Sequence, residues 1–265
     1  MKIIDSEIQE IKNKMLNFKC ESIELEKILI NFLNGNSKFI RSTTAILFFK
    51  SQNYTISEEQ FKILHATEII HNASLIHDDV IDGGVLRRGK KTINIEFDNK
   101  LSVIAGDYLI SQAITELLSL NNNKIINIFT NTISKMCLGE SLQYFSKGSP
   151  PTIQEYLLKT QYKTAELFNA CFASLCEYSN VDAKMASEFA LNYGIAFQIK
   201  NDLNDHLTTS NDLNDNIYNV PSIVGVEKTM SLIDNYCNKI KECLVNIKEN
   251  EYKEYLIELV DELCN

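Results

Sequence analysis

Three aspartates crowd a short stretch of the chain, where Asp78, Asp79 and Asp82 come just before Gly83 and Gly84. The two glycines predict the C-terminal end of a helix, where the helix dipole is already negative. Carboxylates in such a place must be protonated, solvated or bound to cations. Oxygen ligands one helical turn apart suit Mg²⁺, which keeps several waters and shares the phosphates of a substrate. The pattern therefore indicates a magnesium site at a helix end.

Basic residues follow the aspartates directly in the sequence: Arg87, Arg88, Lys90 and Lys91. Guanidinium groups bind phosphate through paired hydrogen bonds, so arginines beside metal-binding carboxylates describe a diphosphate site. The alternative is a helix end with solvated acids and a basic surface loop, because short acidic motifs are common.

The helix that leads to the aspartates is predicted to be buried. Apolar residues cover most of its surface between positions 61 and 81, and no proline interrupts it. One stripe is polar, with members spaced as on one helix face: Thr67, His71, Ser74, Asp78 and Asp82. A polar stripe on a buried helix is expected to face a cavity.

The composition favours long helices. The 265 residues are 45% apolar and include only nine glycines and three prolines, so few residues would break a helix. A chain of this length buries one large core without needing a second domain. We therefore expect an all-α fold, a single-domain bundle of long helices around a central cavity that spans residues 1–265.

The net charge of −9 argues against a nucleic-acid partner, because phosphate backbones need a basic face and the basic residues are scattered. An acidic protein that binds a diphosphate needs a metal to do so. No uninterrupted apolar run approaches the ~18 residues that span a bilayer, and the N-terminus has no signal-peptide pattern. We expect a soluble cytoplasmic protein with no transmembrane segment.

Further helices are predicted from apolar periodicity and from the residues that would end them. They cover residues 3–18, 22–34, 101–120, 124–145, 152–178, 182–206, 222–248 and 250–263. Thr152 and Glu155 form a capping box that starts the helix running towards Tyr178. Residues 208–219 are rich in Asn, Asp, Ser and Thr and are predicted to form a loop.

The helix predicted over residues 182–206 has the same kind of polar face as the helix that leads to Asp78. Gly194, Gln198, Asn201 and Asp205 share one face, and the helix ends in an acidic group that includes Asp202.

Other cations stand where a phosphate could bind. Lys38 and Arg41 lie one turn apart at the start of an apolar helix and would suit a phosphate, although taken alone the pair is better explained as ordinary surface charges. Lys163 lies among apolar neighbours, where a lysine can also simply extend its ammonium to water.

Two helices that end in acidic clusters about 120 residues apart, with an arginine pair after the first, resemble the trans-isoprenyl diphosphate synthases, or polyprenyl synthetases. The stretch SLIHDDVIDGGVLRRGKKT resembles the first aspartate-rich motif of that family. Similar blocks follow in the family's order: AGDYL at 105–109, GESLQ at 139–143, KTAELF at 163–168 and FQIKNDLND at 197–205. The resemblance implies the isoprenoid synthase type I fold and a dimer, either a homodimer or a heterodimer.

The resemblance also implies roles for individual residues. It makes five residues the ligands of up to three Mg²⁺ ions: Asp78, Asp82, Asn201, Asp202 and Asp205. It gives Asp79 a supporting role. The residues expected to hold an allylic diphosphate are Arg87, Lys163, Thr164 and Gln198. Those expected to hold isopentenyl diphosphate are Lys38, Arg41, His71 and Arg88. The group expected to be catalytic is Asp78, Asp79, Asp82, Arg87 and Lys163.

The implied chemistry is the elongation of an allylic diphosphate by isopentenyl diphosphate, five carbons at a time. Metal ions and basic side chains would neutralise the departing diphosphate, and the π-bond of isopentenyl diphosphate would attack the allylic cation. Ala73 and Ser74 lie one turn before Asp78, where short-chain members of the family carry aromatic floors. Their small size predicts a product of at least ~20 carbons.

Three positions depart from the family pattern. Phe39 replaces a cation of the first basic motif, Asn201 replaces the first aspartate of the second acidic motif, and Ile217 replaces a lysine. These departures leave two alternatives to an active synthase. One is a non-catalytic or regulatory subunit of a heteromeric prenyl diphosphate synthase. The other is a terpene-cyclase-like enzyme, whose second metal motif also starts with Asn-Asp.

Overall fold

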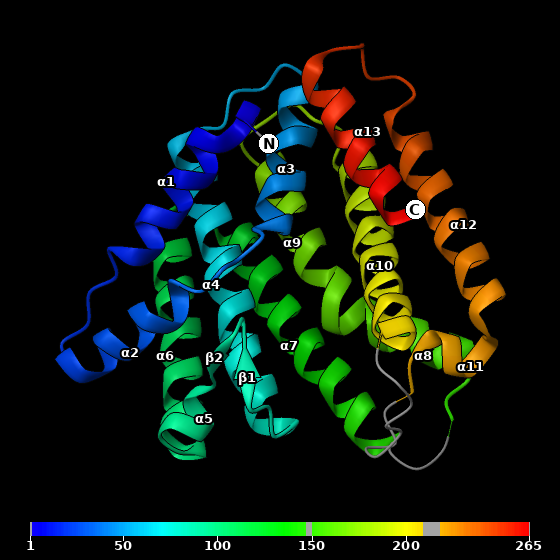
Figure 1. Cartoon of the computed structure of the whole chain (residues 1–265). Helices are drawn as coiled ribbons and strands as arrows, with labels where there is room; N and C mark the ends of the chain where they lie inside the picture. Colours follow the sequence, from blue (N-terminus) through cyan, green and yellow to red (C-terminus); the bar gives the residue numbers. More distant parts are fainter. Residues whose placement is uncertain (1, 147–149, 209–217, 265) are drawn as a thin grey trace. The chain divides into compact units, whose positions relative to one another are not determined.

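The computed structural model describes residues 2–146, 150–208 and 218–264. Within these residues the regular secondary structure is helical apart from one short two-stranded hairpin (Figure 1). The expected all-α fold is confirmed. The chain forms two compact units: unit 1 comprises Met1–Ile46 and Ile56–Ile126, and unit 2 comprises Leu47–Thr55 and Asn127–Asn265.

Unit 1 holds the N-terminal helices and the hairpin. Its elements are η1 (Lys2–Ile4), α1 (Asp5–Leu16), α2 (Ile23–Leu33), the first part of α3 (Ile40–Ser51), α4 (Glu58–Ile81), β1 (Leu86–Arg87), β2 (Lys90–Lys91), α5 (Ile93–Glu96) and α6 (Asn99–Leu118). The two strands pair antiparallel, Leu86 with Lys91 and Arg87 with Lys90.

Helix α4 is the main support of unit 1 and packs along α6. A capping box starts it: the Gln60 backbone N–H donates to the Ser57 hydroxyl at 3.2 Å, and the Ser57 N–H donates to the Gln60 side chain at 2.9 Å. The helix ends at Ile81, with Asp82 as its C-cap and Gly83 at φ +64°. Glycine adopts this left-handed conformation without steric cost, so the predicted stop is confirmed.

Unit 2 holds the C-terminal helices. Its elements are the second part of α3, most of α7 (Asn123–Phe145), α8 (Ile153–Thr160), η2 (Gln161–Ala165), α9 (Glu166–Cys176), α10 (Ala183–Thr208), α11 (Val220–Val224), α12 (Val226–Leu244) and α13 (Glu251–Cys264). An aromatic cluster fills its core. The rings of Phe48 and Phe189 are 4.8 Å apart between centroids, and those of Phe172 and Phe189 are 5.5 Å apart. Such pairs add about 1 kcal/mol each beyond the area that they bury.

Two predicted helices differ from those observed. The helix predicted over 152–178 starts at its capping box, but a π-helical segment, η2, interrupts it between α8 and α9. The helix predicted over 222–248 begins earlier, with Pro221 in the first turn of α11, and breaks at Gly225, which has φ +84°. Most of the loop predicted over 208–219 lies outside the described residues.

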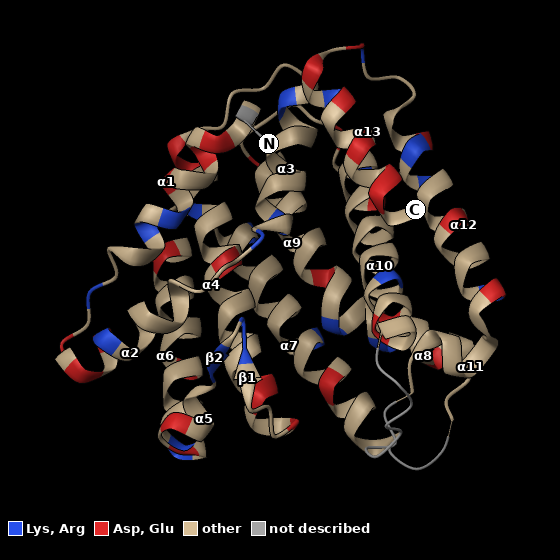
Figure 2. Cartoon of the chain, viewed as in Figure 1, with Lys and Arg blue, Asp and Glu red and all other residues tan. Residues whose placement is uncertain are grey.

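The described helices include one, α6, that by length and composition could cross a membrane, and 33% of its apolar window is buried. The search for uninterrupted apolar runs in the sequence did not find α6, because polar residues interrupt its apolar residues. Its mean hydropathy is high all the same. Core helices of soluble proteins pass the same test, so the finding does not place α6 in a membrane. In the view of Figure 2, basic and acidic residues lie mixed along helices such as α1 and α12.

Candidate active site

The end of α4 joins an aspartate to an arginine of the hairpin. Arg87 donates to the Asp79 carboxylate from Nε at 3.0 Å and from Nη2 at 2.6 Å. Asp79 is buried, so this ion pair neutralises a carboxylate that would otherwise be costly to bury. Gly84 lies directly on this carboxylate, where an added Cβ would come within 2.8 Å of Oδ1. The pair shows that Asp79 orients Arg87. The supporting role at a metal site that is expected of Asp79 stays a prediction.

Asp78 and Asp82 are the other two carboxylates near the helix end. Asp78 is half-buried and Asp82 is exposed, and the Asp82 backbone N–H donates to the Asp78 carbonyl at 2.8 Å. No group of three or more His, Cys, Asp and Glu side chains is gathered for a metal within the described residues. Two hard oxygen donors one turn apart still fit Mg²⁺, because this ion completes its shell with waters and substrate phosphates.

Arg88 is held towards α4 from a strained backbone. Its Nη1 donates to Asn72 at 3.1 Å and its Nη2 to the Ser37 hydroxyl at 3.5 Å. Its φ of +52° lies in the left-handed region, which costs a non-glycine residue about 1 kcal/mol or more. Strain of this kind persists where the surroundings fix a side chain, so the hairpin presents both guanidinium groups in set directions.

A buried carboxylate, Glu68, lies beside the expected isopentenyl diphosphate residues. It accepts from the Ser42 hydroxyl at 2.7 Å and from the Ser42 backbone N–H at 3.2 Å. Burial raises the pKa of Glu68, while the charge of Arg41 acts against this shift. Burial, together with the charges of Arg41 and Arg88, holds the pKa of His71 well below its usual value. His71 is therefore a neutral imidazole at pH 7, with one nitrogen to donate and one to accept.

Lys38 is exposed in the segment before α3, and the next residue departs from the common backbone conformations. Phe39 is buried at φ +49°. A bulky residue in this conformation marks a constrained segment. This segment carries the Lys38 and Arg41 pair expected to bind a phosphate.

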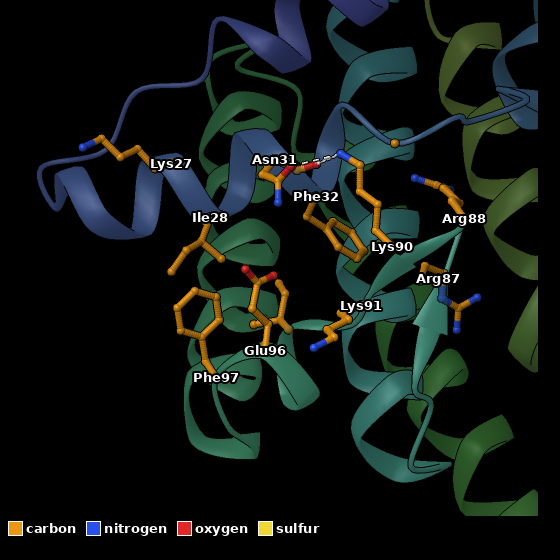
Figure 3. A pocket seen from close by; sticks show the side chains of 12 residues that line it. Lys27, Ile28, Asn31, Phe32, Arg87, Arg88, Lys90, Lys91, Glu96 and Phe97 are labelled. Atoms are coloured by element: carbon orange, nitrogen blue, oxygen red, sulfur yellow. Dashed lines mark hydrogen bonds between the residues drawn. The ribbon is translucent and has the colours of Figure 1, made fainter.

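A groove of about 210 Å³ lies between α2 and the hairpin. Figure 3 shows Arg87 and Arg88 on the side away from Ile28 and Phe97, while Lys90 reaches α2. The Lys90 ammonium donates to the carbonyl of Asn31 at 3.2 Å and to its side-chain oxygen at 3.0 Å. Lys90 therefore fixes the hairpin to α2.

In unit 2, Lys163 is paired with an acid of the GESLQ block. Its Nζ lies 2.5 Å from Oε2 of Glu140 on α7. The two segments come close because Gly139 has no side chain: an added Cβ would lie 2.7 Å from the Lys163 backbone nitrogen. Gly194 of α10 meets Ala165 in the same way. Two glycines thus allow other helices to pack closely against the π-helical segment. Such π-helical turns are frequent at functional sites.

A chain of hydrogen bonds links Thr164 to the acidic end of α10. The Thr164 hydroxyl donates to the Gln198 side chain at 3.2 Å, and the Gln198 amide donates to Asp202 at 2.9 Å. Asp202 also accepts from the Tyr156 hydroxyl at 2.7 Å and from the Val220 backbone N–H at 3.3 Å. Asp202 therefore ties α8 and α11 to α10, and its service as a metal ligand stays a prediction.

Asn201 and Asp205 complete the end of α10. Asn201 is half-buried and Asp205 is exposed. Burial and the nearby charge of Asp202 raise the pKa of Asp205. A cation at this end would lower that pKa again, because it favours the ionised carboxylate.

Four polar side chains contact these residues but were not predicted from the sequence to have a role: Glu68, Asn72, Glu140 and Tyr156. Tyr156 had a detectable signal, since it lies seven residues, or two turns, before Lys163. Glu140 lay within the quoted GESLQ block without a role. Nothing in the local sequence marks Glu68 or Asn72, because their partners lie 16 to 26 residues away along the chain.

The fold itself defines a class of protein. The heptaprenyl diphosphate synthase of Staphylococcus aureus superposes with a TM-score of 0.91, covering 98% of both chains at 21% identity. The chain therefore has the isoprenoid synthase type I fold. At this identity the likeness speaks for the fold alone.

Sequence comparison assigns the family. The polyprenyl synthetase family model matches residues 23–254. A prenyl transferase of Cyanidium caldarium is 31% identical over 290 residues, covering 99% of this chain and 90% of that protein. A decaprenyl-diphosphate synthase of Dictyostelium discoideum is 29% identical over 279 residues, covering 89% of this chain but only 61% of that protein. The chain belongs to the polyprenyl synthetase family of trans-prenyltransferases.

Proposed function

We propose that this chain condenses an allylic prenyl diphosphate with isopentenyl diphosphate to make a longer all-trans prenyl diphosphate of at least ~20 carbons. The observation that carries the proposal is the Asp79–Arg87 ion pair at the end of α4. This pair holds the Arg87 guanidinium at the helix end that carries Asp78 and Asp82, so the proposed phosphate ligand and the proposed metal ligands would lie at one helix end.

The chain's own residues would divide the work as follows. Divalent cations, which the family uses, would be held at Asp78 and Asp82 and would neutralise the leaving diphosphate. Arg87 would hold the allylic diphosphate, with Lys163, Thr164 and Gln198 as further ligands. Asn201, Asp202 and Asp205 are the proposed ligands for the remaining cations, up to three in all.

The second substrate would bind through the basic residues of unit 1. Arg41 and Arg88 offer guanidinium groups and Lys38 an exposed ammonium, while neutral His71 donates a hydrogen bond. A diphosphate placed there would raise the pKa of His71, because it stabilises the protonated imidazole.

Several wider features belong to the same proposal. The two units together would make one isoprenoid-synthase-like domain, residues 1–265. The protein would act as a homodimer, or as a heterodimer with a related chain, and in the cytoplasm. Nucleic acid and membrane spans have no part in it.

Product length is proposed from Ala73 and Ser74, which give the growing chain room to pass. Ala73 is buried, and the half-buried Ser74 hydroxyl donates to the His71 carbonyl at 2.8 Å. A phenylalanine at position 74 would add a ring one turn below Asp78. Chromatography of extracted products is expected to show shorter chains for Ser74→Phe. A wild-type product that stops at ~15 carbons, or an unchanged length in the variant, would contradict the proposal.

A non-catalytic subunit is the second candidate, and the state of α10 favours it. Asn201 lacks a charge, and Asp202 is engaged by three protein donors. A labelled allylic diphosphate, incubated with and without isopentenyl diphosphate, separates the candidates. Elongated product supports the synthase, a cyclised hydrocarbon supports a terpene-cyclase-like enzyme, and no product supports the subunit.

A further inference from the structure

A pocket of about 320 Å³ lies against α8 in unit 2. Among its lining residues, all within the described chain, Lys159 is the one cation and Glu155 the one acid. The Glu155 carboxylate accepts from the Thr152 backbone N–H at 2.7 Å and from the Thr152 hydroxyl at 2.8 Å. It is therefore committed to the helix cap and does not neutralise Lys159.

Lys159 rests on an aromatic ring instead of an acid. Its Nζ lies 4.5 Å from the centroid of the Tyr156 ring, and the described residues offer it no ion pair. The Tyr156 hydroxyl donates to Asp202, so this ring belongs to the hydrogen-bond chain that continues to Gln198 and Thr164. Lys159 thus stands beside the residues proposed to hold the allylic diphosphate.

The burial of Lys159 and the charges around it also favour a bound anion. Burial lowers the pKa of Lys159, the carboxylates of Asp202 and Glu140 oppose this, and Lys163 adds to it. Lys163 already has Glu140 as an ion-pair partner at 2.5 Å. A bound anion would stabilise the ammonium of Lys159 in this partly desolvated place.

We propose that Lys159 binds the allylic diphosphate alongside Lys163 as a second lysine of α8 and η2. The inference rests on the proposed function. The sequence gives it a reason: Ile217, which lies outside the described residues, stands where the family pattern has a lysine. Lys159 would add one cation to a set of diphosphate ligands from which this substitution removes one.

The test compares Lys159→Met with Lys159→Arg and with Lys239→Met. Lys239 is a matched control, because its Nζ lies 4.9 Å from the ring of Tyr236, three residues earlier, as Lys159 lies over Tyr156. Initial rates give KM for each substrate, and calorimetry with inorganic diphosphate and Mg²⁺ gives binding without turnover. Circular dichroism checks that each variant is folded.

Lys159→Met is expected to raise the KM for the allylic diphosphate and the Kd for inorganic diphosphate about tenfold, or ~1.4 kcal/mol. The KM for isopentenyl diphosphate is expected to stay constant, Lys159→Arg to recover most of the loss, and Lys239→Met to match wild type. Unchanged diphosphate binding in Lys159→Met, or an equal loss in Lys239→Met, overturns the proposal. An inactive wild type that still binds diphosphate through Lys159 would refute the proposed function alone.

Discussion

Acidic residues lie at the ends of both α4 and α10, but the partners of the buried and half-buried carboxylates differ. At the end of α4, the buried aspartate is paired with a cation, Arg87, and the outer carboxylates stay near the surface. At the end of α10, Asp202 is engaged by neutral donors, Tyr156 and Gln198. The carboxylate of Asp79 orients the guanidinium group of Arg87, whereas that of Asp202 joins neutral side chains of α8 and α10.

This difference matches the residue types at the two ends. The first end retains every aspartate of the family motif, and the second has Asn201 in place of one. Hard-cation affinity depends on the number of charged ligands, so the first end is expected to bind the tighter metal. Variants at the two helix ends can test this difference, and Asp78 at the end of α4 is expected to give the largest effect.

Removing Asp78 is expected to have the largest effect. Asp78→Ala should lower kcat by about 10³-fold or more, because it removes a charged ligand where transition-state charge is neutralised. The melting temperature should stay constant or rise slightly, since one acid fewer lies at the negative helix end. Elongation assays and circular dichroism melting measure the two effects. Undiminished activity would refute the metal site at α4.

Breaking the ion pair from one side is expected to destabilise unit 1. Arg87→Met leaves Asp79 buried without its cation, at a cost of about 2 kcal/mol or more, reduced because Arg87 is partly exposed. Adding Asp79→Asn should recover part of that loss, because it removes the unpaired charge. Urea unfolding of both single variants and the double variant gives the coupling. Strictly additive losses would show that the pair is not coupled.

Restoring a carboxylate at position 201 tests the end of α10, which is expected to bind its metal more weakly than the end of α4. Asn201→Asp is expected to lower the Mg²⁺ concentration for half-maximal rate about threefold, because a carboxylate replaces a neutral amide. The measurement is initial rate against Mg²⁺ concentration under saturating substrates, beside wild type. An active variant with an unchanged or weaker magnesium dependence would show that Asn201 is not a ligand.

The smallest effect concerns His71. Its pKa is lowered in the folded protein, so below about pH 6.5 the unfolded chain binds a proton that the native state does not. Stability is therefore expected to fall as the pH drops below that value, by up to about 1 kcal/mol over the first unit. His71→Asn should lack this slope. Urea unfolding of both proteins at pH 5.5 and 7 measures the difference, and parallel profiles would contradict it.

The sequence by itself determined the local features of the molecule. The capping box at Thr152 and Glu155, the stop of α4 near Gly83, and the all-α class follow from residue types a few positions apart. Helix periodicity also placed His71 and Asp78 on one face of α4. These features depend on contacts within one or two turns, which the order of residues specifies directly.

Only the tertiary structure decided the partners of the buried and half-buried acids. Asp79 and Asp202 look alike in sequence, but Asp79 meets Arg87 of the hairpin, and Asp202 meets Tyr156, 46 residues away. The π-helical turn that contains Thr164 likewise lies against Gly139 and Gly194 of other helices. Such contacts arise when helices distant in sequence pack together, so periodicity within one helix carries no record of them.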